Sequence, residues 1–301
     1  MPYLTPIALF TFKRPKHTLH TLESLAKNPE FLASPFFIYC DGARNNEEKS
    51  VVEETRQLIR DWQHPNKTII ERDHNWGLAN SVITGVSDLC ERFGSVIVVE
   101  DDLIVSPAFL NYLNTGLVRY ADEPKVMQIS AHMFPVEIQA QTDAIMLPFT
   151  TSWGWATWSR AWQSFDPDMQ GYNTLDLSQA LRQRFDLDSS YPYFKMLKQQ
   201  KAGTVDSWAI RWYLSVFLQN GVVLFPKQTL VLNEGFDGSG SNCKTPQLRT
   251  EVLRHEAIVK FPPVTVDEQS FDKIKLFLRR EQFIVRKLVK YVGAIWARYT
   301  T

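Results

Sequence analysis

Short apolar runs alternate with segments of helical spacing over the first hundred residues, and this alternation admits few folds. Strands that alternate with helices favour a mostly parallel sheet covered by helices on both faces. Right-handed crossovers between parallel strands then make this half of the chain Rossmann-like. The predicted strands are residues 7–12, 36–40, 68–71 and 95–99, and the predicted helices between them are 17–27, 47–62 and 78–93.

The composition narrows the size of the fold and the class of partner. A chain of 301 residues suffices for one large α/β domain, or one domain with an insertion. Lys and Arg together equal Asp and Glu together at 33 each, so net charge gives no argument for a nucleic-acid partner. No run approaches the roughly 20 apolar residues that cross a bilayer, and no targeting leader precedes the first strand. Three cysteines without CxxC spacing indicate a reducing compartment, so we expect a cytoplasmic protein, soluble or peripheral to a membrane.

Beyond residue 105 the regular alternation gives way to a half that is rich in tryptophan. Six of the nine tryptophans lie between Trp153 and Trp212. Residues 233–243 are rich in Gly, Ser and Asn and predict a loop, either plain or acting as a lid. The predicted helices are 107–120, 177–185, 193–201 and 206–220, and the predicted strands are 126–130, 144–149 and 221–226.

Three adjacent carboxylates, Glu100, Asp101 and Asp102, follow the apolar run 95–99. Like charges repel, so a chain that keeps them together at a strand end is expected to face them with a cation. Carboxylate oxygens suit Mg²⁺ or Mn²⁺, and the carboxyl ends of central strands are where α/β proteins bind ligands. In an extended segment Glu100 and Asp102 would share one face and Asp101 the other. The alternative is a solvated loop that leads into the next helix.

The residues VVEDDLIVSPAF, from Val98 to Phe109, resemble the metal-binding segment of the N-acetylglucosaminyltransferase I type family of GT-A glycosyltransferases. The resemblance covers roughly residues 5–240 and implies a GT-A fold: a Rossmann-like, mostly parallel sheet flanked by helices, with a C-terminal helical extension here. It implies an inverting transfer from a nucleotide diphosphate sugar, most simply a UDP-sugar, with Mn²⁺ or Mg²⁺. It implies that Asp102 binds the metal directly, and that Glu100 and Asp101 contact the ribose or the donor sugar.

The same resemblance extends to residues at the ends of the earlier strands. Thr11 and Arg14 match the first strand and its turn, where Arg14 would reach the base or phosphates. Asp41 matches an acid that reads the uracil ring. Asn75 and Gly77 match a helix N-terminus suited to anion binding. The alternatives are a surface cation at Arg14, an Asp-Gly turn at Asp41, and an ordinary helix start at 75–77.

Asp206 matches the base of the family's D-x-W segment, which takes the proton from the acceptor hydroxyl. The alternative is a helix cap, with Trp208 and Trp212 forming a core face at i, i+4 spacing.

Trp153, Gly154 and Trp155 resemble the family's G-x-G-W loop, where aromatic faces would contact a donor or acceptor sugar, and buried packing is the alternative. The chain departs from the family there, because Ser152-Trp153 precedes Gly154.

Residues 271–299 carry eight Lys and Arg against two acids, interleaved with apolar residues, and predict a basic amphipathic helix or pair of helices. This segment either contacts the inner face of an anionic membrane, which suits a lipid-linked saccharide acceptor, or packs on the domain. We expect a transferase domain at 1–265, with a donor half at 1–105 and an acceptor half at 106–265, and a helical extension at 266–301.

Two other functions stay open. A nucleotidyltransferase acting on sugar phosphates also uses strand-end carboxylates and a metal, but the turn Phe12-Lys13-Arg14-Pro15 lacks the glycines and the phosphate-loop spacing expected there. A non-catalytic carbohydrate-binding protein could use the same aromatic residues.

Overall fold

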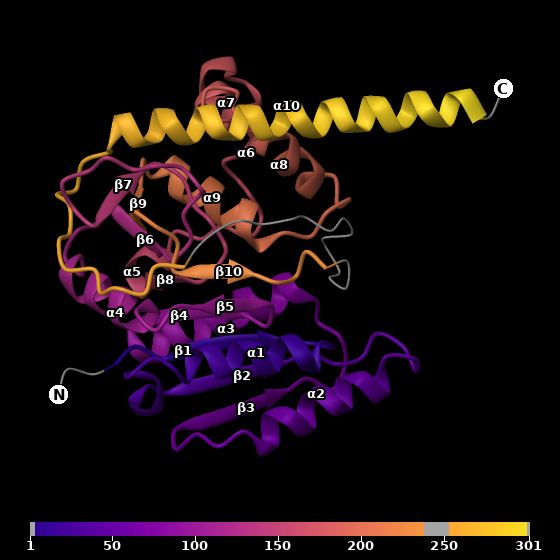
Figure 1. Ribbon diagram of the computed structural model, residues 1–301, viewed down its shortest axis with the longest axis vertical. Helices are drawn as coiled ribbons and strands as arrows, with labels where there is room; N and C mark the ends of the chain where they lie inside the picture. The colour runs from indigo at the N-terminus through magenta and orange to yellow at the C-terminus, as the bar shows by residue number, and fades with distance from the viewer. Residues whose placement is uncertain (1–3, 238–252, 300–301) are drawn as a thin grey trace.

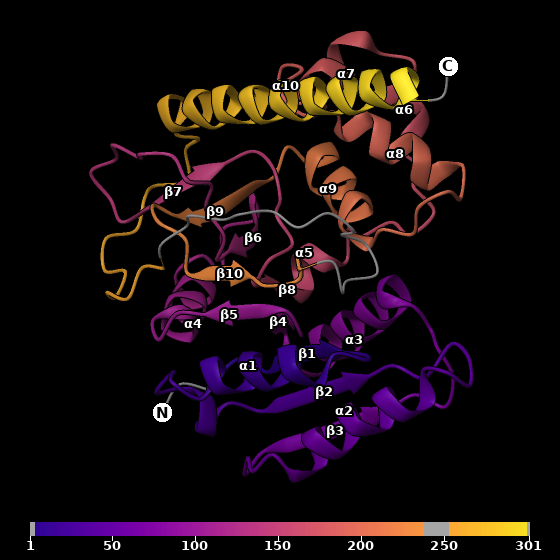
Figure 2. The same ribbon diagram turned by 45° about the vertical axis from the view of Figure 1, so that its right-hand side comes forward.

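The computed structural model describes residues 4–237 and 253–299, with residues 284–299 described as backbone only. Within these residues a central eight-stranded sheet has the order β3-β2-β1-β4-β8-β6-β9-β7, and helices lie on both of its faces (Figures 1 and 2). A second sheet of two strands, β5 and β10, lies beside it.

The first half of the sheet is parallel throughout, as its apolar runs predict. Strand β1 pairs with β2 and β4, and β2 pairs with β3, in each case in parallel. Strands β1 and β2 are buried along their whole length, which is typical of parallel strands covered on both faces. The strands are β1 (Ile7–Thr11), β2 (Phe36–Cys40), β3 (Lys67–Glu71) and β4 (Ser95–Glu100), and the helices are α1 (Pro15–Leu25), α2 (Lys49–Asp61) and α3 (Leu78–Phe93), with a 3-10 turn at Phe31–Ala33.

The second half adds antiparallel strands to the same sheet. Strand β8 (Trp155–Trp158) runs antiparallel between β4 and β6, β7 runs antiparallel to β9, and β6 and β9 are parallel. Four of the seven pairings are therefore parallel, and the predicted α/β class with a mostly parallel sheet is confirmed. The remaining elements are β5 (Leu103–Val105), α4 (Phe109–Arg119), β6 (Val126–Ser130), β7 (Ala144–Leu147), α5 (Ser159–Trp162), α6 (Tyr172–Asp176), α7 (Gln179–Phe185), α8 (Tyr193–Lys201), α9 (Trp208–Leu218), β9 (Val222–Pro226) and β10 (Val231–Asn233).

The C-terminal extension is one helix, α10 (Glu268–Tyr299), and it extends past the body of the domain (Figure 1). Its first turns pack on the domain through Phe271, Ile274 and Leu278, which are buried at helical spacing. The ring of Phe271 stacks on Phe149 with 6.0 Å between centroids. Among the described residues, none of the helices combines the length and apolar character that a bilayer-spanning segment needs.

The structure differs from the sequence predictions at the tryptophan-rich segment, which forms strand β8 in the sheet and not a loop. The residues from Trp155 to Trp158 are all buried, so no alternation of polar and apolar side chains marks them as a strand. The helix predicted at 177–185 begins at Gln179, because the Ser178 hydroxyl caps it by accepting the Leu181 N–H at 3.3 Å.

Candidate active site

Several predicted site residues lie at one edge of the sheet, because neighbouring parallel strands end there together. Strands β2, β1 and β4 are adjacent, and the turns after them carry Asp41, Arg14 and Asp101 in that order. Strand β8 runs antiparallel to β4, so Trp153 and Gly154, just before it begins, reach the same edge. The carboxyl edge of the parallel half is the place where α/β folds bind ligands.

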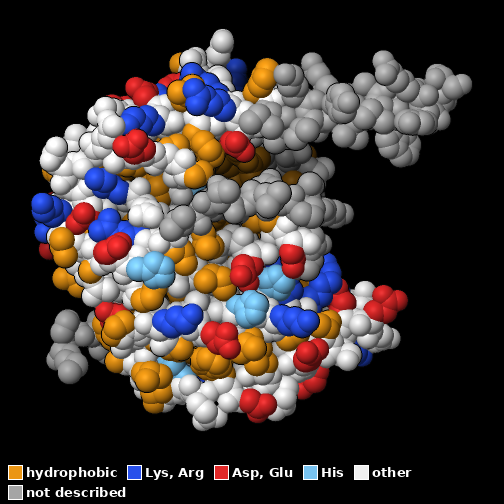
Figure 3. All heavy atoms as spheres, viewed as in Figure 1, with side chains coloured by type: hydrophobic (Ala, Val, Ile, Leu, Met, Phe, Trp, Pro, Cys, Tyr) orange, Lys and Arg blue, Asp and Glu red, His pale blue; other side chains and the backbone are white. Residues whose placement is uncertain are grey.

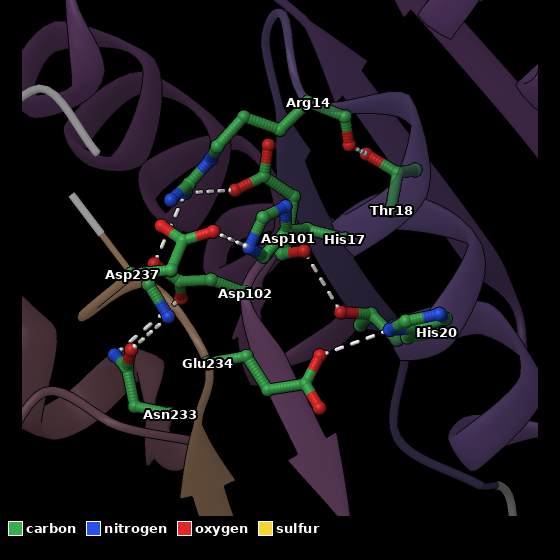
Figure 4. A network of polar contacts seen from close by, with 11 residues as sticks. Arg14, His17, Thr18, His20, Asp101, Asp102, Asn233, Glu234 and Asp237 are labelled. Carbon is green, nitrogen blue, oxygen red and sulfur yellow. Dashed lines mark hydrogen bonds and ion pairs between the residues drawn. The ribbon is translucent and has the colours of Figure 1, made fainter. Parts of the chain in front are cut away.

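Arg14 joins two of the three carboxylates. Its Nη2 donates to Asp101 Oδ1 and, at 3.0 Å, to Asp102 Oδ2 (Figure 4). Asp101 also accepts the Phe12 N–H at 3.3 Å, and its carbonyl accepts the Thr21 hydroxyl at 3.0 Å. Residues 101 and 102 form a turn between β4 and β5, so both side chains face Arg14. The expectation that Asp101 would point away from Asp102 is therefore wrong, since it assumed an extended backbone.

The acidic cluster carries more negative than positive charge. One guanidinium faces three carboxylates, which leaves a formal charge of −2 when all three are ionised. Burial, followed by the charges of Asp102 and Asp101, raises the pKa of Glu100 to about 8. Burial alone would lower the pKa of Arg14, but the charges of Asp101 and Asp102 raise it above its ordinary value. A divalent cation would offset this excess, and the oxygens of Asp102 have the chemistry to bind Mg²⁺ or Mn²⁺.

The described residues contain no group of three or more His, Cys, Asp or Glu side chains arranged to hold a metal. Mg²⁺ sites often need only one or two carboxylates, because the phosphates of a substrate supply further oxygen ligands. Asp102 fits that case, because its side chain is only 12% exposed and lies beside Asp101 and Glu100.

The strap, residues 233–237, crosses over Asp102 after strand β10. The Glu234 N–H donates to the Asp102 carbonyl at 2.8 Å, and Asn233 Nδ2 lies 3.5 Å from Asp102 Oδ1. A side chain at Gly235 would collide with the Asp102 carboxylate, so glycine is required by close approach. The loop predicted from residue 233 is thus packed on the acidic cluster in its first five residues, and its remainder, with Cys243, lies outside the described residues.

Two histidine–carboxylate pairs tie the strap to α1. His20 Nδ1 lies 3.0 Å from Glu234, and His17 Nε2 lies 3.1 Å from Asp237. Figure 3 shows histidine and acidic side chains together at the surface over α1 and the end of β10. The sequence prediction included none of these residues individually; the glycine-rich composition of the strap was the available signal.

Asp41 binds backbone groups on both of its oxygens. Oδ1 accepts the N–H groups of Gly42 at 2.9 Å and Trp76 at 2.8 Å, and Oδ2 accepts that of Gly77 at 2.9 Å. Asn75 adds a hydrogen bond from Nδ2 to the Gly42 carbonyl at 2.9 Å. These bonds join the end of β2 to the start of α3, which fits the turn interpretation. A contact between Asp41 and a base stays a prediction.

Thr11 and Trp76 border this junction. Thr11 is buried at the end of β1, and its carbonyl accepts the Asp41 N–H at 3.0 Å. The guanidinium of Arg72 lies over the Trp76 ring, 3.7 Å from its centroid, which is a close cation–π contact. Nothing in the periodicity of this segment predicted that stack.

We expect Asp41→Asn to lower the free energy of unfolding by about 2–4 kcal/mol, because an amide supplies one acceptor oxygen and points an NH₂ at N–H donors. Denaturant unfolding followed by circular dichroism measures the change. Asp73→Asn, an exposed position in the turn before α3, is the matched control and is expected to leave stability unchanged. Equal stability of both variants would contradict the role given to Asp41.

Asp206 lies beside the start of α3. Its Oδ2 is 4.0 Å from where a Cβ on Gly77 would stand, and α3 and α9 are in contact. Its Oδ1 accepts a hydrogen bond from Arg211 Nη2 at 2.8 Å. The cap of α9 is Ser207, whose hydroxyl accepts the Ile210 N–H, so the capping role considered for Asp206 belongs to its neighbour. The Asp206 side chain is 59% exposed and open to a ligand.

The tryptophan segment divides into a buried and an accessible part. Trp155 is fully buried and stacks on Trp208 with 5.1 Å between centroids, so the prediction that it contacts a sugar is wrong and the packing alternative holds. Gly154 has φ +58°, and a Cβ there would lie 2.7 Å from the Phe109 ring, which explains the glycine sterically. Trp153 is partly exposed and packs edge-on against His132, with 4.4 Å between centroids.

Comparison with known proteins gives partial structural matches. Neither a protein-family model nor a curated protein matches the sequence. The structure of S. aureus TarS 1–349 matches with a TM-score of 0.41 and 12% identity, over 77% of this chain and 61% of TarS 1–349. An active-site mutant of LgtC matches with a TM-score of 0.37 and 8% sequence identity, over 57% of this chain and 64% of LgtC.

The mannosyltransferase PcManGT from Pyrobaculum calidifontis, in complex with GDP-Man and Mn²⁺, matches with a TM-score of 0.31 and 15% identity, over 44% of this chain and 37% of that enzyme. The chain thus spans less than two thirds of the length of each of these proteins. Scores this low do not establish a shared activity, and the family named from the sequence stays a prediction.

Proposed function

We propose that this protein is a metal-dependent GT-A glycosyltransferase that moves a sugar from a nucleotide diphosphate donor, UDP-linked, to a saccharide hydroxyl with inversion. The observation that carries the proposal is the acidic cluster at the carboxyl edge, where the single guanidinium of Arg14 binds both Asp101 and Asp102. A divalent metal would offset the negative charge of this cluster, and a nucleotide diphosphate would supply its remaining oxygen ligands.

On the donor side, Asp102 would hold Mn²⁺ or Mg²⁺, and the ion would supply positive charge against the negative charge that develops on the leaving nucleotide. Glu100 and Asp101 are proposed to contact the ribose or the donor sugar. The N-terminus of α3 begins after Gly77, and its first-turn N–H groups lack partners within the helix, which favours an anion there.

On the acceptor side, Asp206 is proposed as the base that takes the proton of the attacking hydroxyl on Oδ2. Arg211 binds Oδ1 and limits rotation of the carboxylate, which orients the other oxygen. The exposure of Asp206 leaves room for a hydroxyl, and its position beside Gly77 brings it near the proposed anion site. Trp153 supplies an accessible ring for a sugar face.

A thermal-shift experiment with UDP and GDP, each with and without Mn²⁺, tests the proposal. Ligand binding raises the melting temperature in proportion to the logarithm of concentration over dissociation constant. We expect a shift with UDP that requires Mn²⁺, and slow release of UDP from the matching UDP-sugar. No shift with either nucleotide in the presence of Mn²⁺ would overturn the proposal.

We also propose that residues 271–299 contact the inner face of an anionic membrane, so that the acceptor is lipid-linked and serves polysaccharide synthesis. The first turns of α10 pack through Phe271 and Ile274, but the helix continues past the body, and Phe283 is 63% exposed. The residues that follow in sequence remain rich in Lys, Arg and apolar side chains.

Reversing two charges in this helix tests the contact. Arg286→Glu with Lys287→Glu is expected to lower the binding constant for phosphatidylglycerol vesicles, measured by co-sedimentation, by about thirtyfold or more. Each basic residue contributes about 1 kcal/mol at such a surface. Lys27→Glu with Lys49→Glu reverses two exposed lysines, one in the turn after α1 and one at the start of α2, as a control. Equal sedimentation of both variants would leave α10 without a membrane role.

A further inference from the structure

The acidic cluster already contains one cation, which the chain itself supplies. Arg14 stands at the start of α1, and its side chain is only 18% exposed. A single nitrogen, Nη2, donates to both Asp101 Oδ1 and Asp102 Oδ2 (Figure 4). Arg14 thus bridges the two carboxylates in the position where a metal would neutralise them.

The other sides of the Asp102 carboxylate are also covered. Asn233 Nδ2 lies 3.5 Å from Oδ1, and Gly235 approaches Oδ2 so closely that no side chain fits there. A metal that binds Asp102 must therefore take an oxygen that already has a hydrogen-bond donor beside it. The group that donates to Oδ2 is the charged guanidinium of Arg14. A metal ion on the same oxygen would be repelled strongly by this guanidinium, because the site is partly buried.

We propose that Arg14 takes the place of the divalent ion on Asp102 in the metal-free protein, and that metal binding moves it off Asp102 while it keeps Asp101. This inference rests on the proposed function, since it assumes that Asp102 binds the metal. Arg14 is a positioning residue in this scheme. It holds the Asp102 carboxylate in place, and it opposes metal binding when no nucleotide sugar is bound.

The contact on Asp101 explains why Arg14 stays in the cluster. Asp101 is buried and its Oδ1 accepts from Arg14 Nη2, and a buried carboxylate needs a cation beside it. A guanidinium offers several N–H groups in a plane, so it can keep Asp101 and turn a second edge toward a diphosphate. The diphosphate of the nucleotide sugar would then replace the contact that Arg14 loses on Asp102.

Lys13 provides a matched control in the same turn. Its Nζ donates to Glu48 at 2.7 Å and lies 5.7 Å from the centroid of the Phe12 ring. It carries the same charge one residue away, but it pairs with Glu48, whereas Arg14 pairs with Asp101 and Asp102. Removing Lys13 changes the net charge of the turn and leaves the bridge intact.

The test compares Mn²⁺ binding to the full chain, measured by electron paramagnetic resonance titration, in wild type, Arg14→Met, Arg14→Lys and Lys13→Met. We expect Arg14→Met to bind Mn²⁺ about tenfold more tightly or better, since a like charge beside the ion costs several kcal/mol. We expect the Mn²⁺ affinity of Arg14→Lys to lie between those of wild type and Arg14→Met, and the affinity of Lys13→Met to equal that of wild type. Metal-free Arg14→Met should melt at a lower temperature, and Mn²⁺ should restore most of that loss.

Three outcomes separate this inference from the proposed function. If wild type binds Mn²⁺, Asp102→Asn abolishes the binding, and Arg14→Met binds no more tightly than wild type, the inference fails and the proposed function stands. If wild type binds no Mn²⁺ even with UDP, both fail. If Arg14→Met does not fold, Arg14→Lys decides: unchanged Mn²⁺ affinity with a normal melting temperature overturns the inference.

Discussion

Asp102→Asn is expected to lower the rate of sugar transfer by about a thousandfold and to abolish stabilisation by Mn²⁺ with UDP. The amide keeps the shape of the side chain but loses the charge that would hold the ion. With its single oxygen turned toward Arg14, the amide still accepts that hydrogen bond, so the contact is weakened and Arg14 keeps its bond to Asp101. Transfer assays and melting curves with and without Mn²⁺ measure the two effects.

A control separates loss of the metal from loss of the fold. Asp122→Asn changes an exposed aspartate and is expected to preserve both transfer and the Mn²⁺ response. Asp102→Asn should keep the circular dichroism spectrum of wild type, because the turn is also held through the Asp102 carbonyl and Glu234. Turnover within a few fold of wild type at saturating Mn²⁺ would remove Asp102 from the metal site.

The sequence predicts several elements in both halves of the fold, because short apolar runs mark strands and helical spacing marks helices. Strands β2 and β6 and helices α3 and α8 begin and end at the predicted residues. Strand β8 was not predicted. It is buried because β4 and β6 pair with it on either side, and these pairings form only in the folded sheet. Its tryptophans resemble a binding loop in sequence and form packing in the structure.

The site is predictable only in part, for a related reason. The position of Asp101 and Asp102 after a buried strand indicates a charged site, but not the turn that aims both at Arg14. The partners of Asp41 lie 35 and 36 residues further along the chain, and Asn233 lies 131 residues from Asp102. No periodicity encodes such distant pairs, so the strap and the junction at α3 emerge only from the tertiary structure.

Asp206→Asn is expected to lower the turnover number by about a hundredfold to ten-thousandfold, the range that general-base catalysis contributes, and to leave Mn²⁺ and UDP binding unchanged. The reason is geometric: Asp206 pairs with Arg211 and approaches Gly77, whereas Asp102 pairs with Arg14. An effect on turnover without an effect on donor binding is what a base in the acceptor half would give.

Asp188→Asn is the matched control for this variant. Asp188 is also an exposed carboxylate in an ion pair, here with Lys275 at 2.7 Å, and is 48% exposed against 59% for Asp206. Loss of an exposed ion pair contributes little to stability, so Asp188→Asn should transfer sugar at the wild-type rate. Nuclear magnetic resonance of the product adds an independent test, because one displacement aided by one base inverts the anomeric centre. A product that keeps the donor's configuration, or full turnover in Asp206→Asn, would assign the proton to another group.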